Sequence, residues 1–304
     1  MSQQLIDIQL EATLTGHQNP IFALAQPIDS QILYSGGNDK GVVQWDLKQM
    51  KFERILCKVP SSVYSLLAIP NTNLLAIGMR SGHLFIVDTN NQSLVANLKT
   101  EDGAIFDIKV IPGKDELIAI GEEGFAYVWS LNSYNLLYRF RVTDTTSRVI
   151  ALNNDQSILA FGDKNGLIHT YNTSDFQELN KVKIHEMPVT SLLFIGDSLI
   201  SGGRDAKLFK LDINTLAVKQ QIVPHMFTVY GIKKGNNEDL FATVSRDKTL
   251  KIWRERDLAL LKNISRDKGY DSHGLSINTV LFEDYRIFTA SDDKSIKVWN
   301  LELD

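Results

Sequence analysis

Residues 289–300 read TASDDKSIKVWN, and close variants of this stretch occur at three other places in the chain. Ile296 and Val298 alternate with Lys297 and Trp299, which is the pattern of a half-buried β-strand. A run of turn-forming residues precedes that strand. The variants are TVSRDKTLKIWR (243–254), SGGNDKGVVQWD (35–46) and SGGRDAKLFKLD (201–212). A turn and strand that recur in this way indicate an internal repeat, which has to be identified before single elements are assigned.

An aromatic or apolar residue ends the strand of each repeat, at intervals of 40 to 46 residues. These anchor residues include all four tryptophans of the chain: Trp45, Val87, Trp129, Tyr171, Leu211, Trp253 and Trp299. Each repeat has two further apolar stretches upstream, such as IFALAQ and QILYSG, and all but the last have one downstream, such as FERILC. Four short strands per unit of about 42 residues are typical of a β-propeller blade.

We therefore predict an all-β fold, a single seven-bladed β-propeller of four-stranded antiparallel blades in one domain, residues 1–304. No segment shows helical periodicity. The turn before each anchor suits a tight hairpin with positive φ, and four repeats carry a glycine there: Gly41, Gly82, Gly124 and Gly166. The predicted repeats are 15–56, 57–98, 99–141, 142–182, 183–222, 223–264 and 265–304, the last completed by 5–14.

The last repeat is short, because only five residues follow Trp299. They are too few for a fourth strand, whereas IDIQLEATL (6–14) at the other end of the chain has the pattern of the fourth strands elsewhere. We expect this segment to pair with the strand that contains Trp299. The pairing closes the ring and leaves no raw edge at its seam.

The composition limits the function. Of 304 residues, 43% are hydrophobic and 22% charged, and the formal net charge is −4. This weakly acidic balance argues against nucleic-acid binding, which needs a concentrated basic face. The single cysteine, Cys57, excludes an intramolecular disulfide and fits a reducing compartment, for which we expect the cytoplasm, with the nucleus as alternative. The chain starts without a signal-peptide pattern, and no apolar run approaches the roughly 18 residues of a membrane helix.

The repeats resemble the WD-repeat family over essentially the whole chain, with Gly16-His17 opening and Trp45-Asp46 closing the first unit. The resemblance implies a structural tetrad in which a histidine, a strand hydroxyl, a hairpin aspartate and a tryptophan share hydrogen bonds. Three blades match it fully: His17, Ser35, Asp39 and Trp45; His225, Thr243, Asp247 and Trp253; His273, Thr289, Asp293 and Trp299. The fifth blade has His185, Ser201 and Asp205 but Leu211 for tryptophan, and blades two to four lack the histidine.

The tetrad residues also suggest a catalytic triad, but a nucleophile is not normally built four times at blade spacing, so we interpret them as structural. His83 and His169 lie on third strands without a cysteine partner, and we expect ordinary strand surface there rather than a metal site. The glycine-bearing SGGNDKG and SGGRDAK lack the lysine spacing and following helix of a phosphate loop. Cys57 is expected to be inert, in or beside an outer strand.

Repeat spacing aligns one position per blade that the resemblance places at the start of the innermost strand, pointing towards the central opening of one face. These strand-start residues are Phe22, Tyr64, Phe106, Arg148, Thr190, Tyr230 and Asn278. Four aromatics and an arginine are residue types enriched at interaction hot spots. The alternative is that the rings only pack at the junctions between blades.

A second position per blade precedes the hairpin residue, and the resemblance puts it on the same face. These hairpin residues are Asn38, Arg80, Glu122, Lys164, Arg204, Arg246 and Asp292, four of them basic. An aromatic centre with a partly basic rim suits an acidic or phosphorylated peptide. An insertion in SRDKGYDSHG (265–274) is expected on that face as well, as a functional loop or a neutral one.

These features favour a non-enzymatic scaffold that binds a protein or peptide partner, as a monomer or as a subunit of a larger complex. The predicted partner-binding residues are Phe22, Tyr64, Phe106, Arg148, Tyr230, Asn278, Arg80, Lys164, Arg204 and Arg246. The alternative is an enzyme, or a small-ligand or metal site, in the central channel, for which converging carboxylates or histidines would be needed. We expect no cofactor, no metal and no membrane contact.

Overall fold

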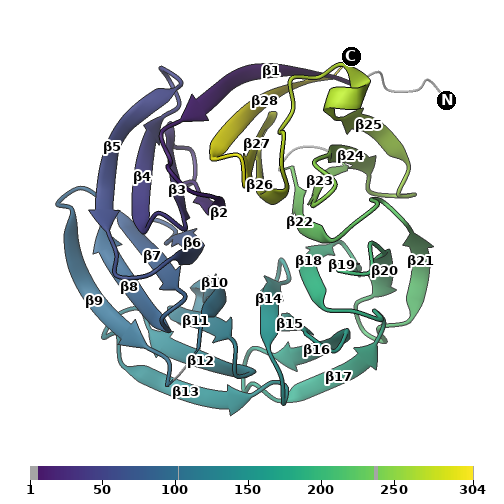
Figure 1. Ribbon diagram of the computed structural model, residues 1–304. Helices are drawn as coiled ribbons and strands as arrows, with labels where there is room; N and C mark the ends of the chain where they lie inside the picture. Colours follow the sequence, from purple (N-terminus) through teal and green to yellow (C-terminus); the bar gives the residue numbers. More distant parts are fainter. Residues whose placement is uncertain (1–5, 102, 236–238, 304) are drawn as a thin grey trace.

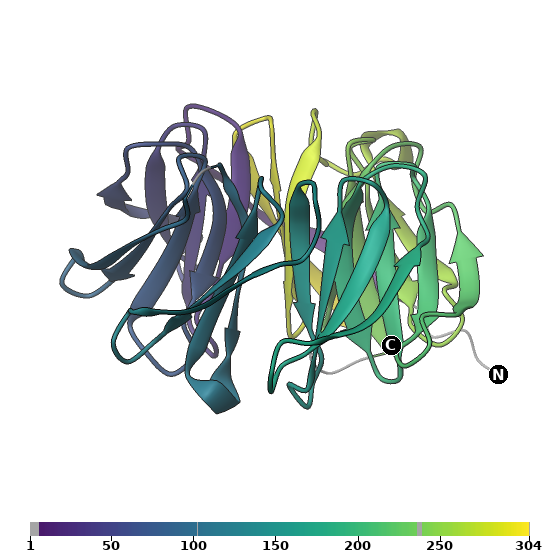
Figure 2. The same ribbon diagram turned by 90° about the horizontal axis from the view of Figure 1, so that it is seen from below.

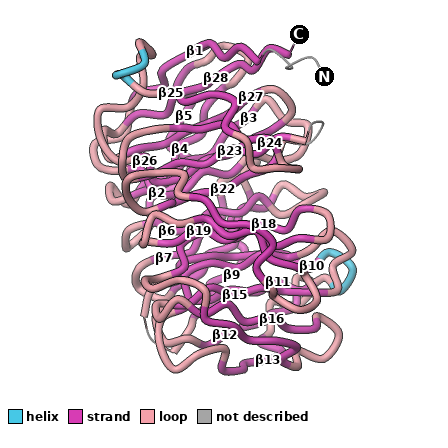
Figure 3. Tube along the Cα trace, turned by 90° about the vertical axis from the view of Figure 1, so that its right-hand side faces the viewer, coloured by secondary structure: helices cyan, strands magenta, loops and turns pink. Residues whose placement is uncertain are grey.

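The computed structural model describes residues 6–101, 103–235 and 239–303. Seven four-stranded antiparallel sheets stand as blades around a common axis (Figure 1), which confirms the predicted fold. Seen edge-on, the strands run between two faces that carry the loops (Figure 2). Within the described ranges the helical segments are two 3-10 turns, η1 (Pro112–Lys114) and η2 (Arg266–Lys268), on opposite faces of the ring (Figure 3). No helix in these ranges is long and apolar enough to cross a membrane.

The two inner strands of each blade come first in the repeat. The innermost strands are β2 (Ile21–Ala25), β6 (Val63–Ala68), β10 (Ile105–Ile111), β14 (Ser147–Leu152), β18 (Val189–Ile195), β22 (Val229–Lys234) and β26 (Ile277–Glu283). The second strands are β3 (Ile32–Gly37), β7 (Leu74–Met79), β11 (Glu116–Gly121), β15 (Ile158–Asp163), β19 (Ser198–Gly203), β23 (Leu240–Ser245) and β27 (Arg286–Ser291). We number the blades in this order, so that blade 1 begins with β2.

The third strand of blades 1 to 6 ends one residue after its anchor, whereas that of blade 7 continues past Trp299 to Leu303, and the fourth strand lies at the circumference. The third strands are β4 (Gly41–Asp46), β8 (His83–Asp88), β12 (Phe125–Ser130), β16 (Leu167–Asn172), β20 (Leu208–Asp212), β24 (Leu250–Arg254) and β28 (Ser295–Leu303). The outer strands are β5 (Lys51–Lys58), β9 (Ser93–Lys99), β13 (Leu136–Arg141), β17 (Glu178–Lys183), β21 (Val218–Ile222), β25 (Leu260–Ile264) and, for blade 7, β1 (Ile6–Thr15).

Burial follows the position of a strand within its blade. Second strands such as β11 and β19 are buried at every residue, because the sheets of neighbouring blades cover both of their faces. Outer strands such as β13 and β17 are mostly exposed. The blades are in close contact near the axis: a Cβ added at Gly36 of β3 would lie 2.6 Å from Val63 of the next blade. Glycine is needed there because no side chain fits between the blades.

The chain closes its own ring. β1 pairs with β28 in antiparallel register, so blade 7 has the order β1-β28-β27-β26, and this confirms the predicted role of residues 6–14. Residue 5, which the predicted boundary included, lies outside the described residues. Ile6 and Ile8 pack in a cluster with residues of blade 6, and Leu14 packs against residues of blade 1. β1 therefore connects blade 7 to both of its neighbours, blades 6 and 1.

The hairpins between second and third strands differ from the prediction in one respect. Gly82, Gly124 and Gly166 adopt positive φ as expected, but in blade 1 Lys40 (φ 59°) takes this conformation and Gly41 opens β4. A side chain at positive φ is unfavourable. In blades 6 and 7 the tetrad aspartate offsets this by accepting a hydrogen bond from the backbone N–H two residues on.

Candidate functional site

Both predicted sets of residues lie on one face of the ring. In all seven blades the backbone N–H of the hairpin residue donates to a carbonyl of the loop that leads into the innermost strand, over 2.8–3.2 Å. The pairs are Asn38–Pro20, Arg80–Ser62, Glu122–Ala104, Lys164–Thr146, Arg204–Pro188, Arg246–Thr228 and Asp292–Ser276. We call this side of the ring the tetrad face, because its loops and hairpins also contain the tetrad histidines and aspartates.

A β-bulge lies at the same place in every innermost strand. In each case the register shifts at one residue, whose neighbours on both sides are paired with the second strand. The bulged residues are the seven strand-start residues Phe22, Tyr64, Phe106, Arg148, Thr190, Tyr230 and Asn278. A bulge bends the strand and redirects the side chain. In each blade, the bulge therefore takes one side chain out of the alternating pattern by which the strand fills the core.

The strand-start residues of blades 1 to 4 form a continuous row. The Phe22 and Tyr64 rings meet edge to face at 5.7 Å between centroids, and Tyr64 stacks on Phe106 at 5.6 Å. The guanidinium of Arg148 lies 4.7 Å from the centre of the Phe106 ring. The three rings are half-buried and Arg148 is exposed. The rings therefore pack at the blade junctions and at the same time remain partly exposed to solvent.

The other three strand-start residues have different surroundings. Thr190 donates from Oγ1 to the carbonyl of Val229 in the next blade (2.6 Å). Asn278 donates from Nδ2 to the carbonyl of Ile21 across the seam (2.9 Å). These two side chains connect neighbouring blades, whereas Tyr230 is exposed.

Basic side chains on the tetrad face are exposed and unneutralised. Within the described part of the chain, no ion pair involves any of the following: Arg80, Arg148, Lys164, Arg204 and Arg246. The acidic hairpin residues are occupied, since Glu122 accepts from the backbone of Ala104 and Asp292 accepts from Asn278. The face therefore has positive charge to offer to a partner.

The tetrad hydrogen bonds are formed in blades 1, 6 and 7. In blade 1, His17 Nδ1 lies 2.6 Å from Asp39, His17 Nε2 lies 2.6 Å from Ser35 Oγ, and the Trp45 indole N–H donates to the same Oγ over 2.7 Å. Blades 6 and 7 have the same contacts. A neutral histidine with its proton on Nδ1 satisfies both ring nitrogens, because the hydroxyl can then donate to Nε2 while it accepts from the indole N–H.

Blade 5 forms the network without the tryptophan. His185 contacts Asp205 (2.9 Å) and Ser201 (3.0 Å), and the Phe209 ring packs edge-on against the histidine. In all four blades the aspartate also accepts the N–H of the residue after the histidine. The tetrads thereby hold the loops of the tetrad face in one conformation.

The tetrad carboxylates and at least one histidine have shifted pKa values. Burial raises the pKa of the aspartates, but hydrogen bonds from histidine and backbone N–H groups outweigh it, so the pKa is lowered for Asp39, Asp205, Asp247 and Asp293. For His225, burial lowers the pKa, and Asp247 offsets this only in part. Both shifts favour an ionised aspartate beside a neutral histidine.

We predict that acidification destabilises the fold in two steps. His225 is neutral when folded, so the unfolded chain gains a proton preferentially as the pH falls below roughly 6.5. The aspartates stabilise the fold above their unfolded pKa of about 4, and this contribution is lost as the pH falls below that value. Thermal unfolding between neutral and strongly acidic pH will show a falling midpoint in both windows. A midpoint that rises on acidification would contradict these assignments.

His169 is not on the strand surface, contrary to our expectation. It is fully buried, and its Nε2 lies 3.4 Å from Asp163, which also accepts from Thr143. Thr143 occupies the place of the missing tetrad histidine, so blade 4 builds a substitute network from this loop residue, Asp163 at the end of β15 and His169 on β16. His83 lies at the surface, beside Asn97.

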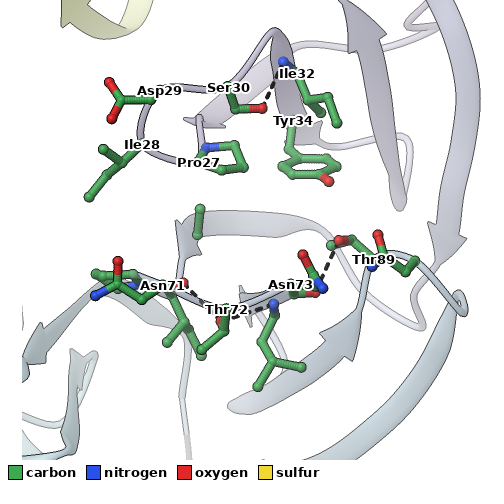
Figure 4. A pocket seen from close by; sticks show the side chains of 15 residues that line it. Pro27, Ile28, Asp29, Ser30, Ile32, Tyr34, Asn71, Thr72, Asn73 and Thr89 are labelled. Atoms are coloured by element: carbon green, nitrogen blue, oxygen red, sulfur yellow. Dashed lines mark hydrogen bonds between the residues drawn. The ribbon is translucent and has the colours of Figure 1, made fainter.

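The opposite face carries a cavity that the sequence did not indicate. It measures about 420 Å³ and lies between blades 1 and 2, under two turns that include Pro27–Ser30 and Pro70–Asn73. Figure 4 shows these turns facing each other, with the Tyr34 ring between them and Thr89 at one end. Its lining is mainly amide, hydroxyl and apolar, with Asp29 as the carboxylate among the lining residues.

The innermost strands bring some charged groups together near the axis. Lys109 pairs with Asp107 (3.0 Å), and the surrounding strands together with the Lys109 ammonium lower the pKa of the exposed Lys233 side chain. Among the described residues, no group of three or more His, Cys, Asp or Glu side chains could hold a metal ion. Cys57 lies half-buried on β5, and burial raises the pKa of its thiol to about 11.

Comparison with known proteins identifies relatives of this chain. The family described as "WD domain, G-beta repeat" matches residues 8–46, 218–254 and 266–300. The 66 kDa stress protein of Physarum polycephalum is 25% identical over 301 residues, 95% of this chain and 48% of that protein. Target of rapamycin complex subunit LST8 of Mus musculus is 24% identical over 252 residues, 78% of this chain and 76% of that protein. The chain thus spans about half the length of the Physarum relative.

Proposed function

Because this chain is a seven-bladed β-propeller of the WD-repeat type, we propose that it is a non-enzymatic scaffold that binds a protein partner on its tetrad face. The observation that carries the proposal is the combination of exposed, unneutralised basic side chains with a row of packed rings on one face. Aromatic and arginine side chains of this kind dominate binding energies at protein interfaces. The row is already packed, so little conformational freedom is lost when a partner binds.

The charge of the face favours an acidic partner segment. The tetrad face carries five exposed basic side chains without ion pairs, one of them Arg148 in the row itself, and of the hairpin residues that are acidic, Glu122 and Asp292 accept hydrogen bonds. The name of one relative describes a subunit of a protein complex, and we extend a similar role to this chain as part of the proposal. As part of the proposal we place the protein in the cytoplasm or nucleus, because a single cysteine fits a reducing compartment.

The test replaces two residues of the row, Tyr64→Ala and Arg148→Glu, in one variant. We expect the amount of partner that the tagged chain captures from native lysate to fall about tenfold or more, because substitutions at hot spots cost about 2 kcal/mol of binding free energy each. Quantitative mass spectrometry of the captured proteins measures the effect.

The matched control is Ile28→Glu, an exposed residue beside the cavity on the opposite face. It introduces a charge without touching the tetrad face and should leave the captured proteins unchanged. Unaltered capture by the double variant, with an unaltered melting temperature, would show that the row of strand-start residues in blades 1 to 4 is not part of the binding site, and would remove the observation that carries the proposal.

A further inference from the structure

Three consecutive blades present large apolar side chains to solvent at one equivalent position. This position lies just before the loop carbonyl that accepts the hairpin N–H, and it is occupied by Met187, Phe227 and Leu275 in blades 5 to 7. Their exposed fractions are 40%, 52% and 49%, and the adjacent Met226 is 81% exposed. The other four blades have Asn19, Ser61, Gly103 and Thr145 there. We call Met187, Met226, Phe227 and Leu275 the apolar arc.

The loops that carry the apolar arc are held rigidly. The tetrad aspartates of blades 5, 6 and 7 accept the backbone N–H groups of Glu186, Met226 and Gly274 over 3.0–3.1 Å. Loops fixed in this way lose little freedom when their side chains are covered. Large apolar side chains exposed on rigidly held loops of three neighbouring blades favour an interaction site.

Two arginines flank the arc and are tied to the same loops. The backbone N–H groups of Arg204 and Arg246 donate to the loop carbonyls of Pro188 and Thr228. The Arg246 guanidinium lies 5.9 Å from the centre of the Phe227 ring. Blades 5 and 6 contribute one guanidinium each rather than a convergent cluster, which suits carboxylates spaced along a chain better than a single phosphate.

We propose that the apolar arc binds a segment of another protein that carries two or more large apolar side chains interspersed with Asp or Glu. Its apolar side chains cover Met187, Met226, Phe227 and Leu275, and its carboxylates pair with Arg204 and Arg246. The inference rests on the proposed function, that the tetrad face binds a protein, and it adds an apolar contact on blades 5 to 7 to the row of strand-start residues on blades 1 to 4.

The experiment selects a displayed random peptide library against the full chain. We expect recovered peptides to combine Asp or Glu with Leu, Ile, Met or Phe. Affinities of synthetic recovered peptides, measured by fluorescence anisotropy, should fall about tenfold or more for Met226→Ser with Phe227→Ser, and for Arg204→Glu. Leu94→Ser on outer strand β9, 54% exposed in the wild type, is the matched control and should bind normally.

The outcomes separate this inference from the proposed function. If peptide binding is lost in the Tyr64→Ala/Arg148→Glu variant but unaffected in the Met226→Ser/Phe227→Ser variant, the inference is overturned and the proposed function stands. Peptides that no tetrad-face variant affects overturn both. A selection without acidic and apolar enrichment overturns the inference, and so does self-association of the wild type that Met226→Ser abolishes, because the arc would then bind a second copy. Circular dichroism melting confirms that each variant is folded.

Discussion

Deleting residues 1–15 will leave a chain that does not form the closed ring in water. The deletion removes β1 and leaves the outer edge of β28 unpaired, while its inner edge still pairs with β27. It also removes Ile6, Ile8 and Leu14, each at most 4% exposed, from the contacts of blade 7 with its neighbours. Burial of three such side chains contributes together roughly 5–9 kcal/mol, which approaches the whole stability of a typical domain, about 5–15 kcal/mol.

In the truncated chain, circular dichroism should show no cooperative unfolding transition, and size-exclusion chromatography should show early-eluting aggregates. A synthetic peptide of residues 1–15, added in trans, should restore a transition, because the register with β28 is self-contained. Asp7→Ser and Gln9→Ser change exposed positions of β1 and should have little effect. A truncated chain with the melting temperature of the full one would refute the role of β1.

Trp45→Ala is expected to destabilise the fold by about 3–5 kcal/mol. The side chain is fully buried, and its loss leaves a cavity at the seam between blades 7 and 1. It also removes the indole N–H that donates to Ser35 Oγ. Urea unfolding of wild type and variant measures the difference as a change in midpoint at constant slope.

Trp45→Phe separates the hydrogen bond from the packing, and Trp129 supplies the comparison. The Trp129 side chain is also buried, but its indole N–H donates to no residue in the described part of the chain. Trp45→Phe should therefore cost about 1 kcal/mol more than Trp129→Phe. Equal losses at both sites would mean that the tetrad hydrogen bond adds nothing measurable.

The fold was predictable because one pattern recurs seven times. The spacing of residues such as Trp45 and Trp299 defines the blades, and the short last repeat indicates the closing role of residues 6–14. A repeat aligns equivalent positions without knowledge of their geometry. The sequence alone therefore identifies the strand-start residues, whereas their bulges are visible only in the structure. The row of packed rings forms because adjacent blades carry aromatic strand-start residues, so that Tyr64 lies between Phe22 and Phe106.

The features that escaped sequence analysis depend on contacts between non-equivalent positions. His169 and Asp163 replace a tetrad from places that the repeat does not mark, so their burial could not be read from spacing. Met226 and Phe227 follow a tetrad histidine directly, yet an apolar residue in a loop does not reveal whether it faces the core or the solvent. A signal was present, since apolar residues occupy one equivalent loop position in blades 5 to 7 alone.

The repeated bulge places the strand-start side chains outside the alternating packing between blades that keeps the molecule folded. At Arg148 and Tyr230 the extra residue lies outside the alternation that fills the space between blades, and both side chains are exposed. Replacing either one changes the chemistry offered to a partner while the packing beneath stays as it is. Such a scaffold can acquire a new specificity by single substitutions, one blade at a time, without a compensating change in its interior.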